Sequence, residues 1–128
     1  MQLHVPVSVG EVLDKITILQ IKLARISDAR KRINIQTELD ALLPLVDGGS
    51  FASSQMQALT AKLKLVNEEL WIIEDDIREK EAAKNFDNEF VQLARAVYVT
   101  NDKRAAIKKQ INLVTGSALI EEKSYEPY

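Results

Sequence analysis

Carboxylates gather in one stretch of the sequence, and carboxylates grouped on one helix face can bind a divalent cation. The members of this acidic stretch are Glu68, Glu69, Glu74, Asp75, Asp76 and Glu79. A metal site needs several of them together, but Glu68 and Asp75 point away from the apolar side of the predicted helix. Arg78 can also pair with Glu74 one helical turn away. The spacing therefore favours a solvent-exposed acidic face, and we predict no metal site and no cofactor.

The composition gives little support for nucleophilic catalysis. His4 is the only histidine and it stands alone in the terminal arm, so the sequence shows no Ser–His–Asp set; the chain has no cysteine, so a Cys–His set is excluded. The absence of cysteine also excludes disulfide bonds and thiolate metal sites. A single histidine near a terminus is more typical of a surface residue than of a catalyst. The sequence therefore names no catalytic residue, and we favour a protein that is not an enzyme.

Arg104 occupies a position where an apolar residue is expected. It belongs to a series spaced by three and four residues, whose other members are Phe90, Leu93, Val97, Thr100, Ile107, Ile111 and Val114. A guanidinium on such a seam must find acceptors or reach water, because burying an unpaired charge is costly. Three explanations stay open. The side chain extends along the seam to water, it forms a polar layer that sets the helix register, or it binds an anionic ligand.

If Arg104 binds a ligand, the side chains predicted to lie beside it complete the candidate site. They are Asn67 and Glu74 on the facing segment, and Asn101 and Lys108 on the segment of Arg104 itself. A closed pocket in which Arg104 has no internal partner would favour a ligand site. A saturated salt bridge would favour a structural role.

Two long amphipathic segments position these residues. The first has apolar residues spaced by three and four at Met56, Leu59, Leu63, Val66, Leu70, Ile73 and Ile77. This spacing is the coiled-coil pattern of a helix packed on a partner helix. Asp87 is a typical N-cap and Gly116 a typical C-terminal glycine for the second segment. Because residues 84–86 make a short connection between them, we predict an antiparallel helical hairpin over residues 53–115.

The predicted hairpin is preceded by N-terminal helices and followed by a tail. Residues 1–7 alternate in polarity and contain Pro6, which predicts an extended arm. Ser8 and Glu11 form a capping box that begins a helix, and Pro44 ends the helical region over residues 8–44. Residues 116–128 form the tail. The expected fold is all-α, a single domain in which an N-terminal helical pair packs on the hairpin to give an elongated bundle.

The first predicted helix carries apolar residues on two faces, which predicts a neighbour on each side. Asp14 is then partly enclosed, and a salt bridge is the simplest way to stabilise it. The N-terminal helices cover one flank of the hairpin and leave the other exposed. The apolar residues of that exposed flank are Leu65, Ile72, Val99 and Leu113.

Burial of this flank is the basis for a predicted homodimer, since a twofold dimer is the commonest way to cover such a patch. The dimer would use the flank or the outer face of the first helix, at Ile18 and Ile21. The alternative is a monomer in which the N-terminal arm and Leu119–Ile120 cover the same surface.

Length and composition are those of one ordinary globular domain. The chain has 128 residues, with 46% hydrophobic and 28% charged residues and a net charge of −2. No basic stripe is present, so we expect no nucleic-acid partner. No secretory signal and no apolar run of membrane-spanning length is visible, so we expect no membrane insertion and a cytoplasmic location.

Two resemblances to enzymes define the alternative function. The stretch EVLDKITILQIKLAR resembles the long first helix of helical chorismate mutases, which are intertwined dimers that bind a dianionic substrate with Arg and Lys. The corresponding candidates are Lys15, Arg25, Arg104 and Lys108. The acidic stretch resembles the carboxylate helices of all-helical nucleotide pyrophosphatases, but its spacing departs from their E-E-x-x-E. The alternative is thus an enzyme or binder that acts on an anionic small molecule between the helices.

A more extensive resemblance covers most of the chain outside residues 40–60. The segments SVGEVLDKITILQIKLARISD, NEELWIIEDDIREKE and VYVTNDKRAAIKKQINLVTGSALIEEKSY resemble a bacterial family of unknown function. Members of that family are often encoded near, or joined to, glycosyltransferases and tetratricopeptide-repeat proteins of surface-polysaccharide synthesis. The resemblance implies an accessory role with a protein partner in that synthesis, and it brings no catalytic residues. We therefore expect a non-enzymatic helical interaction module.

Overall fold

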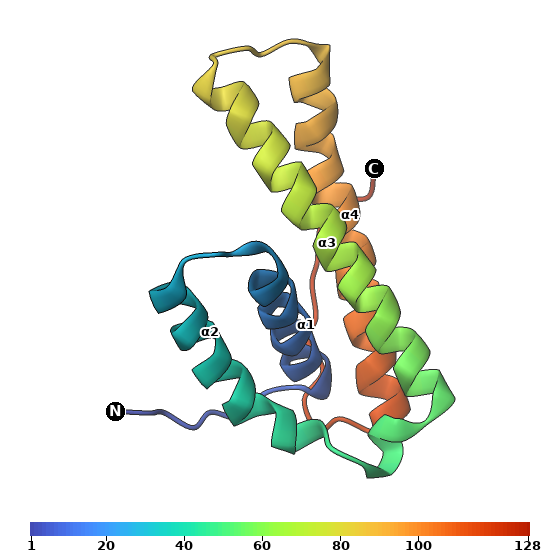
Figure 1. Ribbon diagram of the computed structural model, residues 1–128. Helices are drawn as coiled ribbons and strands as arrows, with labels where there is room; N and C mark the ends of the chain where they lie inside the picture. Colours follow the sequence, from blue (N-terminus) through green and yellow to red (C-terminus); the bar gives the residue numbers. More distant parts are fainter.

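A computed structural model describes residues 1–128, and its regular secondary structure is all helical with no strand, which confirms the predicted fold class. The chain has four α-helices, and the last two are much longer than the first two, as Figure 1 shows. The elements are α1 (Val9–Arg25), α2 (Ala29–Leu42), the short 3₁₀ helices η1 (Leu43–Val46) and η2 (Gly49–Ala52), α3 (Ser54–Ala82) and α4 (Asn88–Thr115). No helix is both long enough and apolar enough to cross a membrane.

The long helices α3 and α4 form an antiparallel hairpin (Figure 1). Their ends are fixed by the residues expected from the sequence. The Ser53 side chain accepts a hydrogen bond from the Met56 amide at 3.1 Å, and the Asp87 side chain accepts one from the Phe90 amide at 3.0 Å. Gly116 ends α4 in the left-handed conformation, with φ of 63°, which costs glycine little.

Helix α1 lies between the other helices and contacts α2, α3 and α4. The Ser8 hydroxyl accepts a hydrogen bond from the Glu11 amide and so caps the helix. Apolar residues from all four helices bury one another around α1 to form the core, which comprises Val12, Leu13, Ile16, Leu19, Ile35, Leu39, Met56, Leu59, Leu63 and Ile111. The position of α1 therefore decides which part of the hairpin is buried.

The hairpin extends well beyond α1 and α2, as Figure 1 shows. We call residues 54–69 and 98–115 the base of the hairpin, and residues 70–97 its tip. Every fully buried side chain of the hairpin lies in the base, and none lies in the tip. In the tip, α3 and α4 contact each other, and Lys80 of α3 lies 3.1 Å from Glu89 of α4. The connection between the helices packs on α4 through an edge-to-face pair between Phe86 and Phe90 at 5.1 Å.

The arm and the tail leave the second flank of the hairpin uncovered. The arm projects from the bundle in Figure 1, and its Leu3 and Val5 are 78% and 67% exposed. Leu119 and Ile120 of the tail are themselves more than 40% exposed. The flank residues Leu65, Ile72, Val99 and Leu113 are 62%, 48%, 36% and 62% exposed, respectively. The structure therefore does not show the alternative predicted from the sequence, in which the arm and Leu119–Ile120 cover this flank in a monomer.

The outer face of α1 is less accessible than the sequence indicated. Ile21 is only 1% exposed, so it packs inside a single chain and cannot form an exposed interface. Ile18 is half-buried and faces a cleft beside Trp71. This corrects one of the two predicted interface positions: α1 uses both of its apolar faces within the chain, because α2 packs on one and the hairpin on the other.

Candidate functional site

The most enclosed charged group of the molecule is the carboxylate of Asp14, which is 1% exposed on the side of α1 that faces α4. The Arg104 guanidinium binds both of its oxygens. Nε donates to Oδ1 at 2.8 Å, and Nη2 donates to Oδ2. A two-pronged contact of this kind combines charge with fixed geometry and is among the stronger hydrogen-bonded pairs in proteins.

Two further side chains complete the surroundings of Asp14. The Asn67 amide nitrogen, on α3, donates to Asp14 Oδ1 and to Thr17 Oγ1, each at 3.0 Å. The Thr17 hydroxyl donates in turn to the Asp14 backbone carbonyl at 2.9 Å. On the far side, Asn101 Oδ1 accepts from Arg104 Nη1 at 3.4 Å. Three helices thus contribute to one saturated polar layer.

The electrostatics of this layer favour the charged forms of both partners. Burial alone would raise the pKa of Asp14, but hydrogen bonds from Arg104 and Asn67 and the nearby positive charges outweigh it, so this pKa lies below its ordinary value of 3.8. The hydrogen bond to Asp14 raises the pKa of Arg104. Neither group is therefore poised to exchange a proton near neutral pH.

A second polar layer lies one helical turn from the first. Lys108 Nζ donates to Glu11 Oε2 at 2.7 Å and lies 3.3 Å from Glu121 Oε1, and its side chain is only 13% exposed. Glu121 belongs to the tail and also accepts from the Ser8 hydroxyl at 3.0 Å. Burial would lower the pKa of Lys108, but the hydrogen bond to Glu11 and the surrounding carboxylates raise it overall.

A third layer joins the first turn of α1 to the end of α4. The Gly10 amide donates to Asn112 Oδ1 at 2.6 Å, and the Val9 amide donates to Ser117 Oγ at 3.1 Å. A Cβ atom on residue 10 would lie 2.6 Å from the Lys108 carbonyl oxygen. Glycine is therefore required here, because the two helix backbones approach too closely for any side chain.

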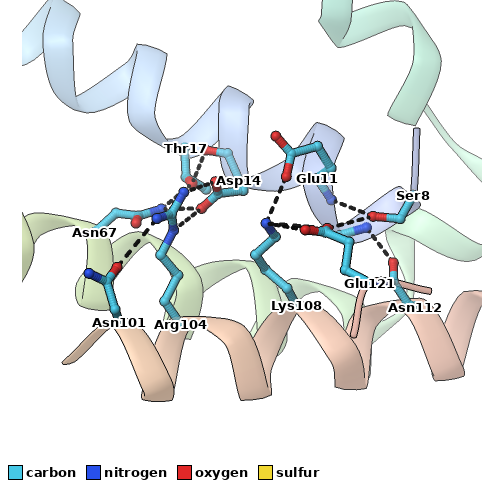
Figure 2. A network of polar contacts seen from close by, with 11 residues as sticks. Ser8, Glu11, Asp14, Thr17, Asn67, Asn101, Arg104, Lys108, Asn112 and Glu121 are labelled. Atoms are coloured by element: carbon cyan, nitrogen blue, oxygen red, sulfur yellow. Dashed lines mark hydrogen bonds and ion pairs between the residues drawn. The ribbon is translucent and has the colours of Figure 1, made fainter. Parts of the chain in front are cut away.

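Together these layers form what we call the polar ladder, whose contacts between α1 and α4 are Asp14–Arg104, Glu11–Lys108 and Gly10–Asn112. Figure 2 shows α1 and α4 side by side with these contacts arranged along them. Positions rise along α1 as they fall along α4, so the two helices run antiparallel. The acidic groups come from α1 and the basic groups from α4, and this charge complementarity sets their register.

The structure brings together most of the residues proposed as a ligand site. Asn67, Glu74, Asn101 and Arg104 line one cleft of about 460 Å³, which Trp71 also borders. Lys108 lies outside that cleft, in the second layer of the ladder. Arg104 has a saturated ion pair with Asp14, so the geometry matches the polar-layer explanation of this residue. The acidic residues of α3 gather no group of three or more side chains that could hold a metal ion.

Sequence reasoning missed several members of the ladder. It expected a salt bridge for Asp14 without naming its partner, and it gave no role to Glu11 beyond capping or to Asn112. A signal was available in the spacing of Arg104, Lys108 and Asn112, which recur every four residues on one helix face. Glu11 and Asp14, three residues apart on one face of another helix, are the acidic groups that can pair with such a stripe.

These features define an all-helical protein with a buried polar ladder between its first and last helices. The chain belongs to a family of unknown function, DUF6165, whose model matches residues 3–128. No curated protein and no solved structure was found to match it. The resemblance to a family of unknown function is thus confirmed.

Proposed function

We propose that the chain is a non-enzymatic helical interaction module that associates with a second copy of itself through the exposed flank of the hairpin. The observation that carries this proposal is the flank itself. Leu65 and Ile72 lie seven residues apart on α3, as do Val99, Ala106 and Leu113 on α4. All are exposed. A side chain repeated every seven residues stays on one face of a helix.

The two stripes adjoin each other and form one surface. A groove of about 410 Å³ between α3 and α4 is lined by Ala58, which lies seven residues before Leu65 on the α3 stripe, and by Leu113 of the α4 stripe. Neighbouring apolar stripes on an antiparallel helix pair have the geometry of half a four-helix bundle. A second copy related by a twofold axis would supply the same surface and complete the bundle.

The state of Arg104 supports an interaction module over an enzyme for an anionic substrate. The Arg104 guanidinium already donates hydrogen bonds to both carboxylate oxygens of Asp14. A substrate carboxylate would have to displace a partner that is 1% exposed and held by Asn67 as well. The buried charges of Asp14 and Arg104 are therefore engaged in holding α1 against the hairpin.

The dimer is tested by sedimentation equilibrium at micromolar concentrations. The wild-type chain should sediment with twice its mass of 14.4 kDa. Ile72→Glu should give the monomer, because a carboxylate would be buried opposite its symmetry copy. Ile33→Glu is the matched control: Ile33 is 65% exposed on α2, away from the flank, and its variant should remain dimeric. A wild-type monomer of 14.4 kDa would overturn the proposal.

A narrower form of the proposal is an accessory role in surface-polysaccharide synthesis, which follows from the family resemblance. Affinity purification of the tagged chain from its native host tests it. A glycosyltransferase or a tetratricopeptide-repeat protein should co-purify with the wild-type chain. If neither is enriched over an unrelated tagged protein, the narrower role is wrong, and the sedimentation result still decides whether the chain self-associates.

A further inference from the structure

A small polar cavity lies between α4 and the tail, on the side of α4 next to the polar ladder. Its volume is about 50 Å³, enough for a few water molecules or one small oxyanion. The polar residues that line it include Asn101, Arg104, Lys108, Asn112, Glu121 and Lys123. Most of these side chains are hydrogen-bond donors, and Glu121 is the one carboxylate among them.

Asn112 is the residue that makes this cavity informative. The residue is 1% exposed, and its Oδ1 accepts from the Gly10 amide, which fixes the orientation of the side-chain amide. Its Nδ2 is the one buried side-chain nitrogen or oxygen of the chain that has no hydrogen-bond partner. Leaving a buried donor unsatisfied costs free energy, so native structures rarely do so. An acceptor in the cavity would satisfy it.

The charges around the cavity indicate what kind of acceptor fits. Lys123 forms no ion pair, and its ammonium group lies 5.8 Å from the centre of the Tyr125 ring. The Glu121 carboxylate is already engaged by Ser8 and Lys108. The cavity therefore has more donors than acceptors, and at least one cation that no carboxylate neutralises.

We propose that this cavity binds a small oxyanion, the phosphate or carboxylate group of a small organic molecule. Asn112 Nδ2 donates to the oxyanion from the buried side, and Lys123 supplies charge from the tail. The inference does not depend on the proposed dimer, since the exposed flank includes none of the residues that line the cavity.

An adjoining groove offers room for the rest of such a molecule. The groove has a volume of about 680 Å³ and shares Asn101, Arg104 and Lys123 with the cavity. Three tyrosines line it, and two of them, Tyr98 and Tyr128, form an edge-to-face pair at 5.4 Å. Aromatic walls of this kind favour a ligand with a flat apolar body. Phenyl phosphate and benzoate are suitable probes, because each joins an oxyanion to a ring.

The test is a titration of the ¹⁵N-labelled chain with phenyl phosphate and, separately, with benzoate, followed by two-dimensional NMR. Saturable shifts are expected at the side-chain amides of Asn112 and Asn101 and in the backbone of residues 117–124. If only one probe binds, it shows whether the site takes a phosphate or a carboxylate group. If both bind, the site accepts either group. If neither probe moves the Asn112 side-chain signal at millimolar concentration, the proposal is wrong.

Three variants connect the shifts to the cavity. Lys123→Met should weaken binding about three- to fivefold, the effect expected of one partly exposed charge. Lys103→Met is its control, because Lys103 is an exposed lysine on α4 outside the cavity, and its variant should bind like the wild type. Glu121→Gln should tighten binding, since it removes the negative charge and keeps an acceptor for Ser8. If Lys123→Met and Lys103→Met weaken probe binding equally, the proposed site in the cavity is wrong.

Asn112→Asp tests the buried donor itself. The aspartate keeps an oxygen for the Gly10 amide at the positive end of α1, so the fold should persist. It replaces the Nδ2 donor with a charged oxygen, so probe binding should be lost. Retained binding in a folded Asn112→Asp chain would contradict the proposal. If this variant does not fold, the Lys123→Met and Glu121→Gln results decide.

Discussion

The base and the tip of the hairpin have the same apolar spacing but very different burial. In the base, Leu63 and Ile111 are fully buried and Met56 is 1% exposed. In the tip, the equivalent seam residues Ile73, Ile77 and Leu93 are only half-buried. The two regions belong to the same two helices, so helix formation alone cannot account for the difference.

The difference arises from α1, which packs on the base and borders only the first turns of the tip, where Ile18 lines a cleft with Leu70 and Trp71. Two helices bury only the narrow seam between them, whereas a third helix also covers the sides of that seam. The polar ladder fixes where α1 docks, because Asp14 and Glu11 can pair with Arg104 and Lys108 in one register only. We therefore expect stability to be concentrated in the base, with the tip opening at lower free energy.

The largest effect is expected from breaking the ladder at Arg104. Arg104→Leu leaves the buried Asp14 carboxylate without its cation, and loss of one partner from a buried pair typically costs about 3–5 kcal/mol. Urea unfolding followed by circular dichroism measures this loss. Asp14→Leu/Arg104→Leu should recover much of it, because both charges are then removed together. If Arg104→Leu alone is as stable as the wild type, the structural role of Arg104 is contradicted.

A matched pair of cavity-forming variants compares base and tip directly. Leu63→Ala should destabilise the chain by about 2–5 kcal/mol, because Leu63 is fully buried. Ile77→Ala, at a seam position of the tip, should cost about 1 kcal/mol or less, because its side chain is only half-buried. Hydrogen exchange should likewise be faster for tip amides. Equal losses in the two variants would mean that the tip is as tightly packed as the base.

A smaller effect is expected from widening the contact between α1 and α4. Gly10→Ala places a methyl group against the Lys108 carbonyl, and overpacking of this kind costs about 1–3 kcal/mol. Alanine normally stabilises a helix relative to glycine by up to about 1 kcal/mol, so the sign of the change is the test. Thermal unfolding should show a lower midpoint for Gly10→Ala, and a higher midpoint would show that the helices can separate without cost.

The smallest effect is expected from a change of pH. The contribution of Asp14 to the free energy of unfolding should stay constant over the neutral range and be lost only in strong acid. The pKa of Asp14 is below its ordinary value of 3.8, so its contribution is complete above that pH and disappears as the pH falls through the lowered pKa. The stability difference between the wild type and Asp14→Asn should thus stay constant from neutrality to pH 5 and shrink towards pH 2. A difference that already shrinks above pH 5 would contradict the lowered pKa.

The hairpin was predictable from sequence because its determinants are local. The three-four spacing, the caps at Ser53 and Asp87 and the glycine at position 116 each act within a few residues, and each appears in the structure as expected. The unequal burial of base and tip was not predictable in this way. It depends on where α1 docks, and the spacing of the hairpin is the same along its whole length.

The candidate site was predictable only in part, for a related reason. Arg104 was identified because an arginine on an apolar seam demands an explanation, and Asn67 and Asn101 followed from helix geometry. The pairing of Arg104 with Asp14 joins residues 90 positions apart, so it depends on tertiary packing that no local pattern encodes. Asn112 was missed because an asparagine on a polar helix face resembles any solvated residue until its surroundings are known.

The distance along the chain between the two sides of the polar ladder has a consequence for synthesis of the protein. Helix α1 is made early, but the partner of Asp14 follows 90 residues later. At about 5–20 residues per second, the delay is about 5 to 18 s. During that time Leu13, Ile16 and Leu19 have no hairpin to pack against. The nascent chain should therefore depend on a chaperone that shields the first helix until the last one leaves the ribosome.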